Sequence, residues 1–481
     1  MTNYLQQILT YFRNMALNAA GVERDLLQYI QDGDITSAIN LMQDLDSEVD
    51  NALEEYNPQT HEVMRRANKF RKNDSPYITE KLPRTRQRYI NEVELFFLLG
   101  NPILWKKEDG DDEAYQLFTD FLKAQRFNAN MRKVKRLAGA ETQAAKLYHI
   151  FRDEATSEMQ VRTVVLARQT GYRLRPMFDQ YGNLRACAYG YTLTEKGKSI
   201  EHWDIQTPEL LFYCKKSPIG WDIQTFKNPT GKINIIYYRQ PKAWDGAEPR
   251  IKREEMLDSK VADTNNYFAD PIAAASADVI RSMTDPNAVG KLIQLNGDGS
   301  KFEYINPPQN SAARDAEKQD LNDSILFDTM TPDFSFEKIK GMGTLSGDAI
   351  KNAMILGYIK RDNRMEVYEE MVDRERSVII AILKFLHPNM ADKLDKLSIS
   401  FSFAEPFAQD KQRNWEAISS LYQAGVCSLE NAVTMLALTD APEEEIAKIK
   451  AGAAQEEPEQ QKIGFKNTAA QEEGTEKGAT L

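Results

Sequence analysis

The chain is poor in the side chains from which disulfides and metal centres are built. It has 481 residues but three cysteines, Cys187, Cys214 and Cys427, which are far apart and form no CxxC pair. An odd, dispersed set of this kind is typical of reduced thiols and argues against a disulfide framework. The histidines are equally few: His61, His149, His202 and His387. Imidazole-rich metal sites are therefore poorly supplied, and we expect no cofactor.

Long apolar runs are missing as well. The most apolar stretches, residues 95–99 (LFFLL) and 378–383 (VIIAIL), are far shorter than the roughly 20 residues that a membrane-spanning helix needs. The first residues, MTNYLQQ, have neither the basic nor the apolar region of a signal peptide. With 42% hydrophobic and 28% charged residues, the composition is that of an ordinary folded protein. The sequence predicts a soluble, intracellular protein with two or three compact regions and no membrane partner.

Positive charge is in deficit. The 61 Lys and Arg residues are outnumbered by 72 Asp and Glu residues, which gives a net charge of −11. This balance argues against a protein that grips nucleic acid over its whole surface, because the phosphates would be repelled. It is compatible with a protein past which nucleic acid slides without sticking.

Motifs for catalysis are missing too. A P-loop requires G-x4-G-K-[ST], and the nearest approach, residues 197–199 (GKS), has threonine at position 192 in place of the first glycine. Residues 341–347 (GMGTLSG) are one residue off a dinucleotide-binding fingerprint and follow no clear strand. Residues 332–338 lack the carboxylate-x-lysine strand of a metal nuclease. The sequence predicts that the protein is not an enzyme, although a triad assembled from distant segments stays open.

The first half of the chain divides into a helical and a β-rich part. Apolar spacings of three and four predict helices over residues 1–165, and strand-like composition broken by turn signals predicts a β-rich part over 166–248. The helical part contains a basic cluster, residues 132–136 (RKVKR). We weigh two roles for it: a solvated face or salt bridges to nearby acids such as Glu141, and contact with DNA.

The most informative segment is 309–386. A polar helix over 311–327 should end before Pro332, which disfavours the α conformation at Thr331. Three glycines between 341 and 347 then give the backbone unusual freedom. A helix without proline follows over 348–386, and its 39 residues would make a rod about 60 Å long. Such a rod, entered by a glycine-rich loop, is more typical of a mechanical part than of a catalytic pocket.

The elements around this segment complete the pattern. A polar helix is predicted over about 250–268, short strands near 291–295 and 301–305, and an alternating strand over 396–403. Amphipathic helices are predicted over 408–452, one of them starting at Ser428. The tail from 453 has no apolar period, and we expect it to be disordered.

Four segments, in this order, resemble the portal proteins of tailed bacteriophages, the head-tail connectors, in particular the branch found in long-tailed phages. They are residues 66–72 with 88–102, residues 250–271, residues 331–351, and residues 403–406 with 421–431. The resemblance implies an α+β subunit of a cyclic, dodecameric ring at one capsid vertex, through which DNA enters and leaves. It also implies these parts: wing 1–248, stem helix 249–270, clip 271–308, second stem helix 309–330, tunnel loop 331–347, long tunnel helix 348–387, return to the wing 388–407 and crown 408–452.

The resemblance also supplies site residues and partners. Phe334, Phe336, Lys338, Lys340 and Lys351 become candidates for contact with DNA in the channel, with the alternative that the phenylalanines anchor the loop in the core. In the clip, contacts with other proteins would involve Asp298, Lys301 and Glu303. The expected partners are copies of the chain itself, double-stranded DNA bound without sequence specificity, the terminase large subunit, the major capsid and scaffold proteins, and head-completion or tail proteins. The expected location is the virion, and the host cytoplasm during assembly.

Two alternatives remain at this stage. A nucleic-acid-processing enzyme of a mobile element would need a dense carboxylate or nucleotide site, which the sequence does not offer. A structural adaptor with a long helical arm would remain a monomer, so its size under native conditions separates it from a ring.

Overall fold

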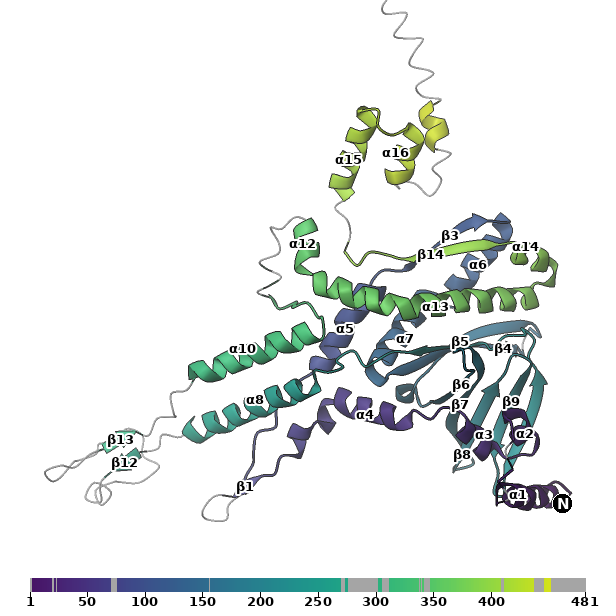
Figure 1. Ribbon diagram of the computed structural model, residues 1–481, viewed down its shortest axis with the longest axis horizontal. Coiled ribbons are helices and arrows are strands. Elements are labelled where there is room, and N and C mark those ends of the chain that lie inside the picture. The colour runs from purple at the N-terminus through teal and green to yellow at the C-terminus, as the bar shows by residue number, and fades with distance from the viewer. Residues whose placement is uncertain are drawn as a thin grey trace, which may run out of the picture. The chain divides into compact units, whose positions relative to one another are not determined.

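The computed structural model describes residues 2–19, 21–22, 24–70, 76–154, 156–269, 273–275, 302–304, 311–336, 338, 340, 347–407, 411–436 and 445–450. The chain divides into two compact units, Met1–Pro406 and Phe407–Leu481. The first unit mixes helices and antiparallel sheets (Figure 1). The described residues of the second include the helices α15 (Lys411–Gln423) and α16 (Leu429–Leu436), and residues 445–450 are also helical.

Two antiparallel sheets form the centre of the first unit. The larger has the strand order β10-β9-β8-β7-β6 and the smaller β11-β4-β5. Their strands are β4 (Gln143–Arg152), β5 (Met159–Leu166), β6 (Arg173–Phe178), β7 (Leu184–Glu195), β8 (Lys198–Gln206), β9 (Leu210–Lys216), β10 (Trp221–Lys227) and β11 (Ile235–Arg239). Each strand in the larger sheet pairs with its neighbour in sequence, so this sheet is a simple meander.

The two-residue period of the strands sorts side chains into separate cores. On β7, Cys187 and Tyr189 pack against the smaller sheet, while Ala186 and Ala188 point the other way. Two short helices, α2 (Leu26–Gln31) and α3 (Ile35–Leu41), cover that second face. The smaller sheet is covered on its outer face by helices. The result is four layers, helices–sheet–sheet–helices.

The cysteines fit this layering. Cys187 and Cys214 lie on opposite faces of the larger sheet, so they cannot meet. Burial raises the pKa of each thiol to about 12, which keeps it protonated and unreactive at neutral pH. All three cysteines are free, as the sequence predicts.

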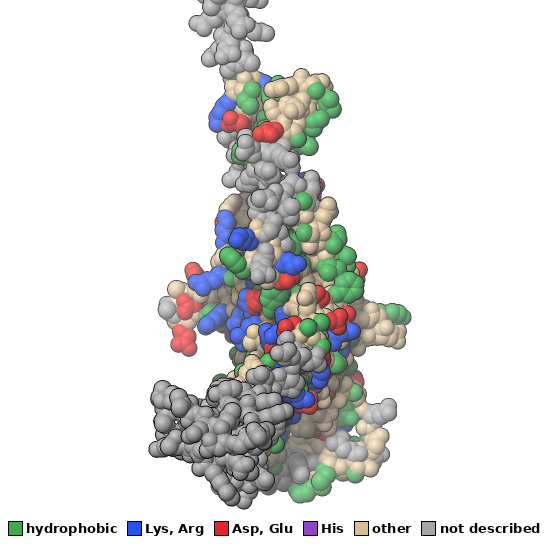
Figure 2. Space-filling model, turned by 90° about the vertical axis from the view of Figure 1, so that its left-hand side faces the viewer, with side chains coloured by type: hydrophobic (Ala, Val, Ile, Leu, Met, Phe, Trp, Pro, Cys, Tyr) green, Lys and Arg blue, Asp and Glu red, His purple; other side chains and the backbone are tan. Residues whose placement is uncertain are grey.

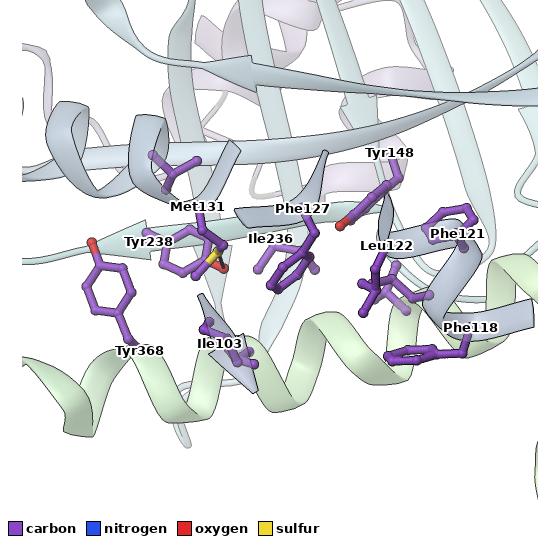
Figure 3. Packing of buried hydrophobic residues seen from close by; sticks show 14 of the residues in the cluster. Ile103, Phe118, Phe121, Leu122, Phe127, Met131, Tyr148, Ile236, Tyr238 and Tyr368 are labelled. Carbon is purple, nitrogen blue, oxygen red and sulfur yellow. Dashed lines mark hydrogen bonds between the residues drawn. The ribbon is translucent and has the colours of Figure 1, made fainter. Parts of the chain in front are cut away.

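Helices cover the outer face of the smaller sheet. They are α5 (Arg86–Leu99), α6 (Asp112–Ala124), α7 (Phe127–Glu141) and α13 (Ile355–Leu386). Figure 3 shows side chains from these layers converging, with Tyr368 of α13 beside Tyr238 of β11 at 5.3 Å between ring centroids. The remaining N-terminal elements are α1 (Thr2–Ala19), α4 (Asp46–Tyr56), η1 (Pro58–Thr60), η2 (Glu62–Arg65), β1 (Lys69–Phe70) and β2 (Pro76–Tyr77).

The prediction that residues 1–165 are helical is wrong in three places. The short strands β1 and β2 lie within 69–77, residues 103–109 form β3 (Ile103–Asp109), and residues 143–152 and 159–166 form β4 and β5. Strand β4 (QAAKLYHIFR) lies between β5 and β11 and is buried on both faces over its first six residues. Because both faces are buried, the strand has no alternation of polar and apolar residues, and the small and charged residues Ala144, Ala145 and Lys146 resemble a helix.

The predicted strand at 396–403 is confirmed as β14 (Ser398–Phe403), which pairs with β3 far away in sequence. It follows η4 (Pro388–Met390) and α14 (Ala391–Asp395). The predicted helix start at Ser428 is also confirmed, since the Ser428 hydroxyl oxygen accepts a hydrogen bond from the N–H of Asn431 at 3.2 Å. The tail from 453, which is expected to be disordered, lies outside the described residues.

The long helix is present but is not continuous from 348. Residues 347–353 form α12 (Gly347–Ala353), and the chain turns at Met354 (φ −103°, ψ 15°) before α13 begins. The 32 residues of α13 correspond to a rod of about 48 Å instead of 60 Å. Gly357 in its first turn permits close packing, because a Cβ atom there would lie 2.4 Å from the ring of Phe97. From the sequence alone, a glycine at this position is only tolerated in a helix. In the structure it is required, because any larger side chain would collide with Phe97.

Two polar helices project beside the layered part (Figure 1): α8 (Glu248–Ala269) and α10 (Ser311–Asp328). Both are predicted by the sequence. They run antiparallel and are linked by ion pairs, among them Lys318–Asp258 at 2.9 Å and Arg253–Glu317 at 2.6 Å. Between them in sequence, β12 (Ala273–Ala275) pairs with β13 (Phe302–Tyr304), which confirms the strand predicted near 301–305. The strand predicted at 291–295 lies outside the described residues.

Candidate functional site

The segment that leads from α10 towards α13 is anchored at its start. Helix α10 ends in a Schellman motif, in which Met330 adopts a left-handed conformation (φ 48°) and the N–H of Thr331 donates to the carbonyl of Leu326 at 2.8 Å. The hydroxyl of Tyr89 on α5 then accepts from the N–H of Phe334 and donates to the carbonyl of Pro332, both at 2.8 Å. One tyrosine therefore holds both sides of this turn against α5.

The predicted channel residues separate into an anchored and an exposed set. Phe334 packs against Phe96 and Phe97, with ring centroids 6.1 and 6.3 Å apart, which is the core role weighed for it as an alternative. Phe336 is 80% exposed. Lys338 and Lys340 are exposed as well, whereas Lys351 lies half-buried in α12. Phe336, Lys338 and Lys340 thus form one short exposed stretch, while residues 341–346 and the side chains of 337 and 339 lie outside the described part of the chain.

Three residues in the segment that joins α8 to α10 are predicted to contact other proteins, and two of them lie outside the described residues. Asp298 and Lys301 both fall there. Glu303 lies in β13, where its backbone is paired with Ala274. The role expected for these three residues therefore stays a prediction.

Helix α8 is held by a strap from its own subunit. Acidic residues on α8 bind residues 79–86, which run along the helix: Arg86 reaches Glu254 at 2.7 Å, and the N–H of Glu80 donates to Asp263 at 2.7 Å. Glu254, Glu255, Ser259 and Asp263 are all buried. The subunit therefore buries this polar face of α8 by itself. Figure 2 views the molecule from the left-hand side of Figure 1, and in that view Lys and Arg side chains gather in the middle with Asp and Glu among them.

His61 ties α8 to the end of α4. Its Nδ1 lies 2.7 Å from Oε1 of Glu255, and its Nε2 lies 2.8 Å from the carbonyl oxygen of Glu55. Both ring nitrogens face acceptors, so the doubly protonated ring donates to both. Burial alone would lower the pKa of His61, but Glu255 outweighs it and the pKa is raised above its ordinary value.

The contact between His61 and Glu255 makes the free energy of unfolding depend on pH. Because the pKa of His61 is higher in the folded chain than in the unfolded one, its contribution is complete below about pH 6.5 and is lost as pH rises through the folded-state pKa. We expect His61→Gln to lower the free energy of unfolding by about 1.5–3 kcal/mol near pH 6 and by clearly less near pH 9. Urea titrations of both proteins at both pH values measure this. An equal difference at the two pH values would show that His61 is not charged.

Helix α13 is fixed to the layers beneath it by a buried charge cluster around Glu94 of α5. Its carboxylate lies 2.7 Å from Lys135, 3.2 Å from Lys360 and 3.0 Å from Arg364. Burial works to raise the pKa of Glu94, but the three cations outweigh it and hold the pKa well below its usual range. Burial, only partly offset by Glu94, lowers the pKa of Lys360 to about 8. We name Glu94, Lys135, Lys360 and Arg364 the Glu94 cluster.

A second buried cluster lies further along α13, around Glu375. The ammonium group of Lys146 on β4 lies 2.5 Å from its carboxylate. The hydroxyls of Tyr148 and Tyr238 also donate to it, the latter at 2.9 Å. All four side chains are buried or nearly so. We name these four residues the Glu375 cluster.

Neither cluster was found from the sequence. The signals were weak: Glu94 interrupts the apolar run 93–99, and Lys146 stands in the apolar stretch 144–151. Lys135 belongs to the basic cluster 132–136, of which Arg136 pairs with Glu92 of α5 at 2.5 Å. Glu141 pairs with none of these residues; its carboxylate accepts backbone N–H groups of Arg168 and Gln169. Two residues of the basic cluster 132–136, Lys135 and Arg136, do form salt bridges, but with Glu94 and Glu92 and not with Glu141.

The opposite face of α13 is acidic. Its exposed charged residues are Asp362, Glu366, Glu369, Glu370 and Asp373. Its basic residues in the same stretch, Lys360, Arg361, Arg364 and Arg374, are buried or half-buried against the rest of the unit. The long helix therefore presents carboxylates outward and keeps its cations inside.

Neither a metal-binding group nor a membrane-spanning helix is found in the described part of the chain. There, no group of three or more His, Cys, Asp and Glu side chains could hold a metal ion. None of the helices placed in the structure is both long and apolar enough to span a bilayer.

Comparison with known families identifies the chain. Residues 36–459 match the family described as "Phage portal protein, SPP1 Gp6-like". The chain belongs to this family. By this membership it is a phage portal protein.

Solved structures similar to this portal protein come from gene transfer agent (GTA) particles. They are the neck of an empty GTA particle computed with C6 symmetry (11% identity, 74% of this chain and 89% of that chain, TM-score 0.42), the neck of a native GTA particle computed with C12 symmetry (12%, 74% and 91%, TM-score 0.41), and the virion of a native GTA particle (10%, 74% and 92%, TM-score 0.39). No curated protein matches the chain.

Proposed function

We propose that this portal protein assembles into a closed ring of twelve subunits at one capsid vertex and serves as the conduit for DNA during packaging and ejection. Membership of the portal family over residues 36–459 supports this role. The observation that carries this proposal is the way α13 is held in the subunit. This helix has 32 residues and is fixed by two buried charge clusters. It is preceded in the chain by an exposed stretch with Phe336, Lys338 and Lys340. A rigid helix of this kind can hold a loop at a fixed place in a channel.

The parts of the subunit follow from this role. The layered part, 1–248, would be the wing, to which β14 in 388–407 returns. Helices α8 and α10 would be the stem (249–270 and 309–330), and 271–308 would be the clip. Residues 331–347 and 348–387 would be the tunnel loop and tunnel helix, and 408–452 the crown.

Contact with DNA would be made to the backbone, without reading its sequence. Lys338 and Lys340 supply mobile point charges for phosphates, and Phe336 supplies an exposed ring. The net charge of −11 keeps the DNA from sticking elsewhere. The outcome is a conduit that touches DNA at few positions.

Other partners follow from the same position at the vertex. The terminase large subunit would dock during packaging, with Asp298, Lys301 and Glu303 in its contact surface, and head-completion and tail proteins would dock afterwards. Major capsid and scaffold proteins would surround the ring. Assembly would take place in the host cytoplasm, and the mature site would be the virion.

Electron microscopy of the purified protein, with native mass alongside, tests the ring. We expect rings with a central hole of at least about 20 Å, wide enough for a grooved duplex. A monomer at all concentrations would contradict the proposal and favour the adaptor with a long helical arm.

Reversing the charge of the exposed lysines tests the contact with DNA. We expect Lys338→Glu with Lys340→Glu to lower the yield of packaged genomes on the order of tenfold, which corresponds to about 1.4 kcal/mol of lost interaction. Ring formation should be unchanged. Genome protection from nuclease in assembled particles measures the yield, and Lys198→Glu with Lys227→Glu, two exposed positions on the larger sheet, is the matched control. A yield equal to that of the control would show that Lys338 and Lys340 do not contact DNA.

A further inference from the structure

We infer that neighbouring subunits join through opposite charges: the outer face of α13 in one subunit contacts the outer face of α5 and α7 in the next. The first surface, the acidic ridge, consists of Asp362, Glu366, Glu369, Glu370 and Asp373. The second, the basic face, consists of Arg88, Arg132, Lys133 and Arg136. This inference rests on the proposed ring and names the surfaces that would close it.

The acidic ridge is a repulsive stripe within one subunit. Asp362, Glu366 and Glu369 follow one another at spacings of four and three, so they stand on one side of the helix. All three are exposed, and none forms an ion pair with any other described residue. Like charges at these spacings destabilise a helix, and cations from outside the subunit would relieve the repulsion.

Three of the four cations in the basic face have no acidic partner within the described part of the subunit. Arg132 and Lys133 on α7 and Arg88 on α5 are exposed, and none of them has an ion-pair partner in the described part of the chain. Arg136 pairs with Glu92, which shows that the outer sides of α5 and α7 lie next to one another. The basic face is therefore one surface built from two helices.

These two surfaces point in opposite directions. Glu94 on α5 meets Lys360 and Arg364 on α13, so these residues mark the sides on which the two helices face each other. Each residue turns a helix by about 100°, so a residue two positions away points to roughly the opposite side. Glu92 accordingly faces away from α13, and Asp362, two positions from both Lys360 and Arg364, faces away from α5.

Opposite placement is what a head-to-tail ring requires. In such a ring each subunit offers one surface to the neighbour on one side and a different surface to the neighbour on the other. Two complementary surfaces on opposite sides of one subunit meet this condition, whereas a two-fold dimer would need one surface that matches itself. Charge complementarity also fixes which surfaces meet and suppresses wrong pairings. DNA could occupy the basic face instead, but this would leave the acidic ridge without a partner.

A charge-swap experiment tests the pairing. The first variant carries Asp362→Lys, Glu366→Lys and Glu369→Lys, so its ridge holds three cations against two anions and both of its surfaces are basic. The second carries Arg88→Glu, Arg132→Glu and Lys133→Glu, so its other surface holds three anions against one cation and both of its surfaces are acidic. Lys198→Glu with Lys227→Glu, on the larger sheet, is the matched control. Sedimentation and electron microscopy report rings, and circular dichroism reports folding.

We expect each variant alone to fold but to need at least about tenfold more protein for assembly, because like charges would face each other. Mixed in equal amounts, the two variants should form rings in which they alternate, and native mass should give a one-to-one composition. Wild-type rings should weaken at high salt, which screens exposed charges.

The remaining outcomes overturn the inference. Rings of normal stability from either variant alone would show that these surfaces do not meet, while the proposed ring would stand. Loss of assembly without rescue on mixing would also reject charge pairing. Normal rings from the second variant together with weaker retention of DNA would assign the basic face to DNA. Absence of rings from the wild-type protein would reject both the ring and the interface.

Discussion

Replacing Glu94 by glutamine is expected to lower the free energy of unfolding by about 3–5 kcal/mol, the usual result of removing one partner from a buried ion pair. The substitution keeps the shape of the side chain but removes the only anion that faces Lys135, Lys360 and Arg364 in this cluster. The side chains of Glu94 and Lys135 are fully buried, so water cannot replace the lost charge. The remaining cations would repel one another across a short distance.

The same helix offers a matched control. Glu92, two residues away, is 42% exposed and pairs with Arg136 on the surface. We expect Glu92→Gln to cost less than about 1 kcal/mol, as exposed ion pairs do. Urea titration followed by tryptophan fluorescence measures both. If the two variants lost similar stability, the Glu94 cluster would not be what holds α13 in place.

The second large effect is expected at Glu375. Glu375→Gln would leave Lys146 buried without an anion, and we again expect a loss of about 3–5 kcal/mol. Burial, partly offset by Glu375, already lowers the pKa of Lys146. Without the carboxylate, the lysine would have to lose its proton or leave the core. Either change would loosen α13 from β4.

A double variant separates charge from packing. Lys146→Met with Glu375→Gln removes both charges while keeping similar volumes, and such replacements are often neutral or stabilising. We expect the double variant to recover most of the loss, so that the coupling energy between the two sites exceeds about 2 kcal/mol. Additive losses in the same urea titrations would instead mean that packing, and not the buried charge, dominates. Tyr148 and Tyr238, which also donate to Glu375, are unchanged in the two single variants, Glu375→Gln and Lys146→Met, and in the double variant.

Both experiments bear on the proposed role of α13. A helix that positions a loop in a channel must resist displacement, and its two clusters fasten it to α5, α7 and the smaller sheet. Loss of either cluster should therefore reduce DNA packaging as well as stability. The charges that point outward, in the acidic ridge, should instead affect assembly with little effect on the stability of one subunit.

The sequence by itself determined the elements whose signals are local. The polar helices α8 and α10, strand β14, the cap at Ser428 and the proline that follows α10 each depend on a few neighbouring residues, and each is found as predicted. The order of four such segments was enough to indicate the portal family, to which the chain belongs. The sequence also indicated that Phe336, Lys338 and Lys340 follow α10, and the structure leaves these three exposed.

Tertiary structure decided what depends on distant partners. Lys146 lies in a strand because β5 and β11 bury both faces of β4, although the local residues resemble a helix. Gly357 is required because Phe97, some 260 residues earlier, packs against it. Glu94 and Glu375 lie in the core because basic side chains from α7, β4 and α13 lie against them. A charged or small residue has the same local pattern on a surface and in a core, and only the partners that folding brings to it decide which of the two it occupies.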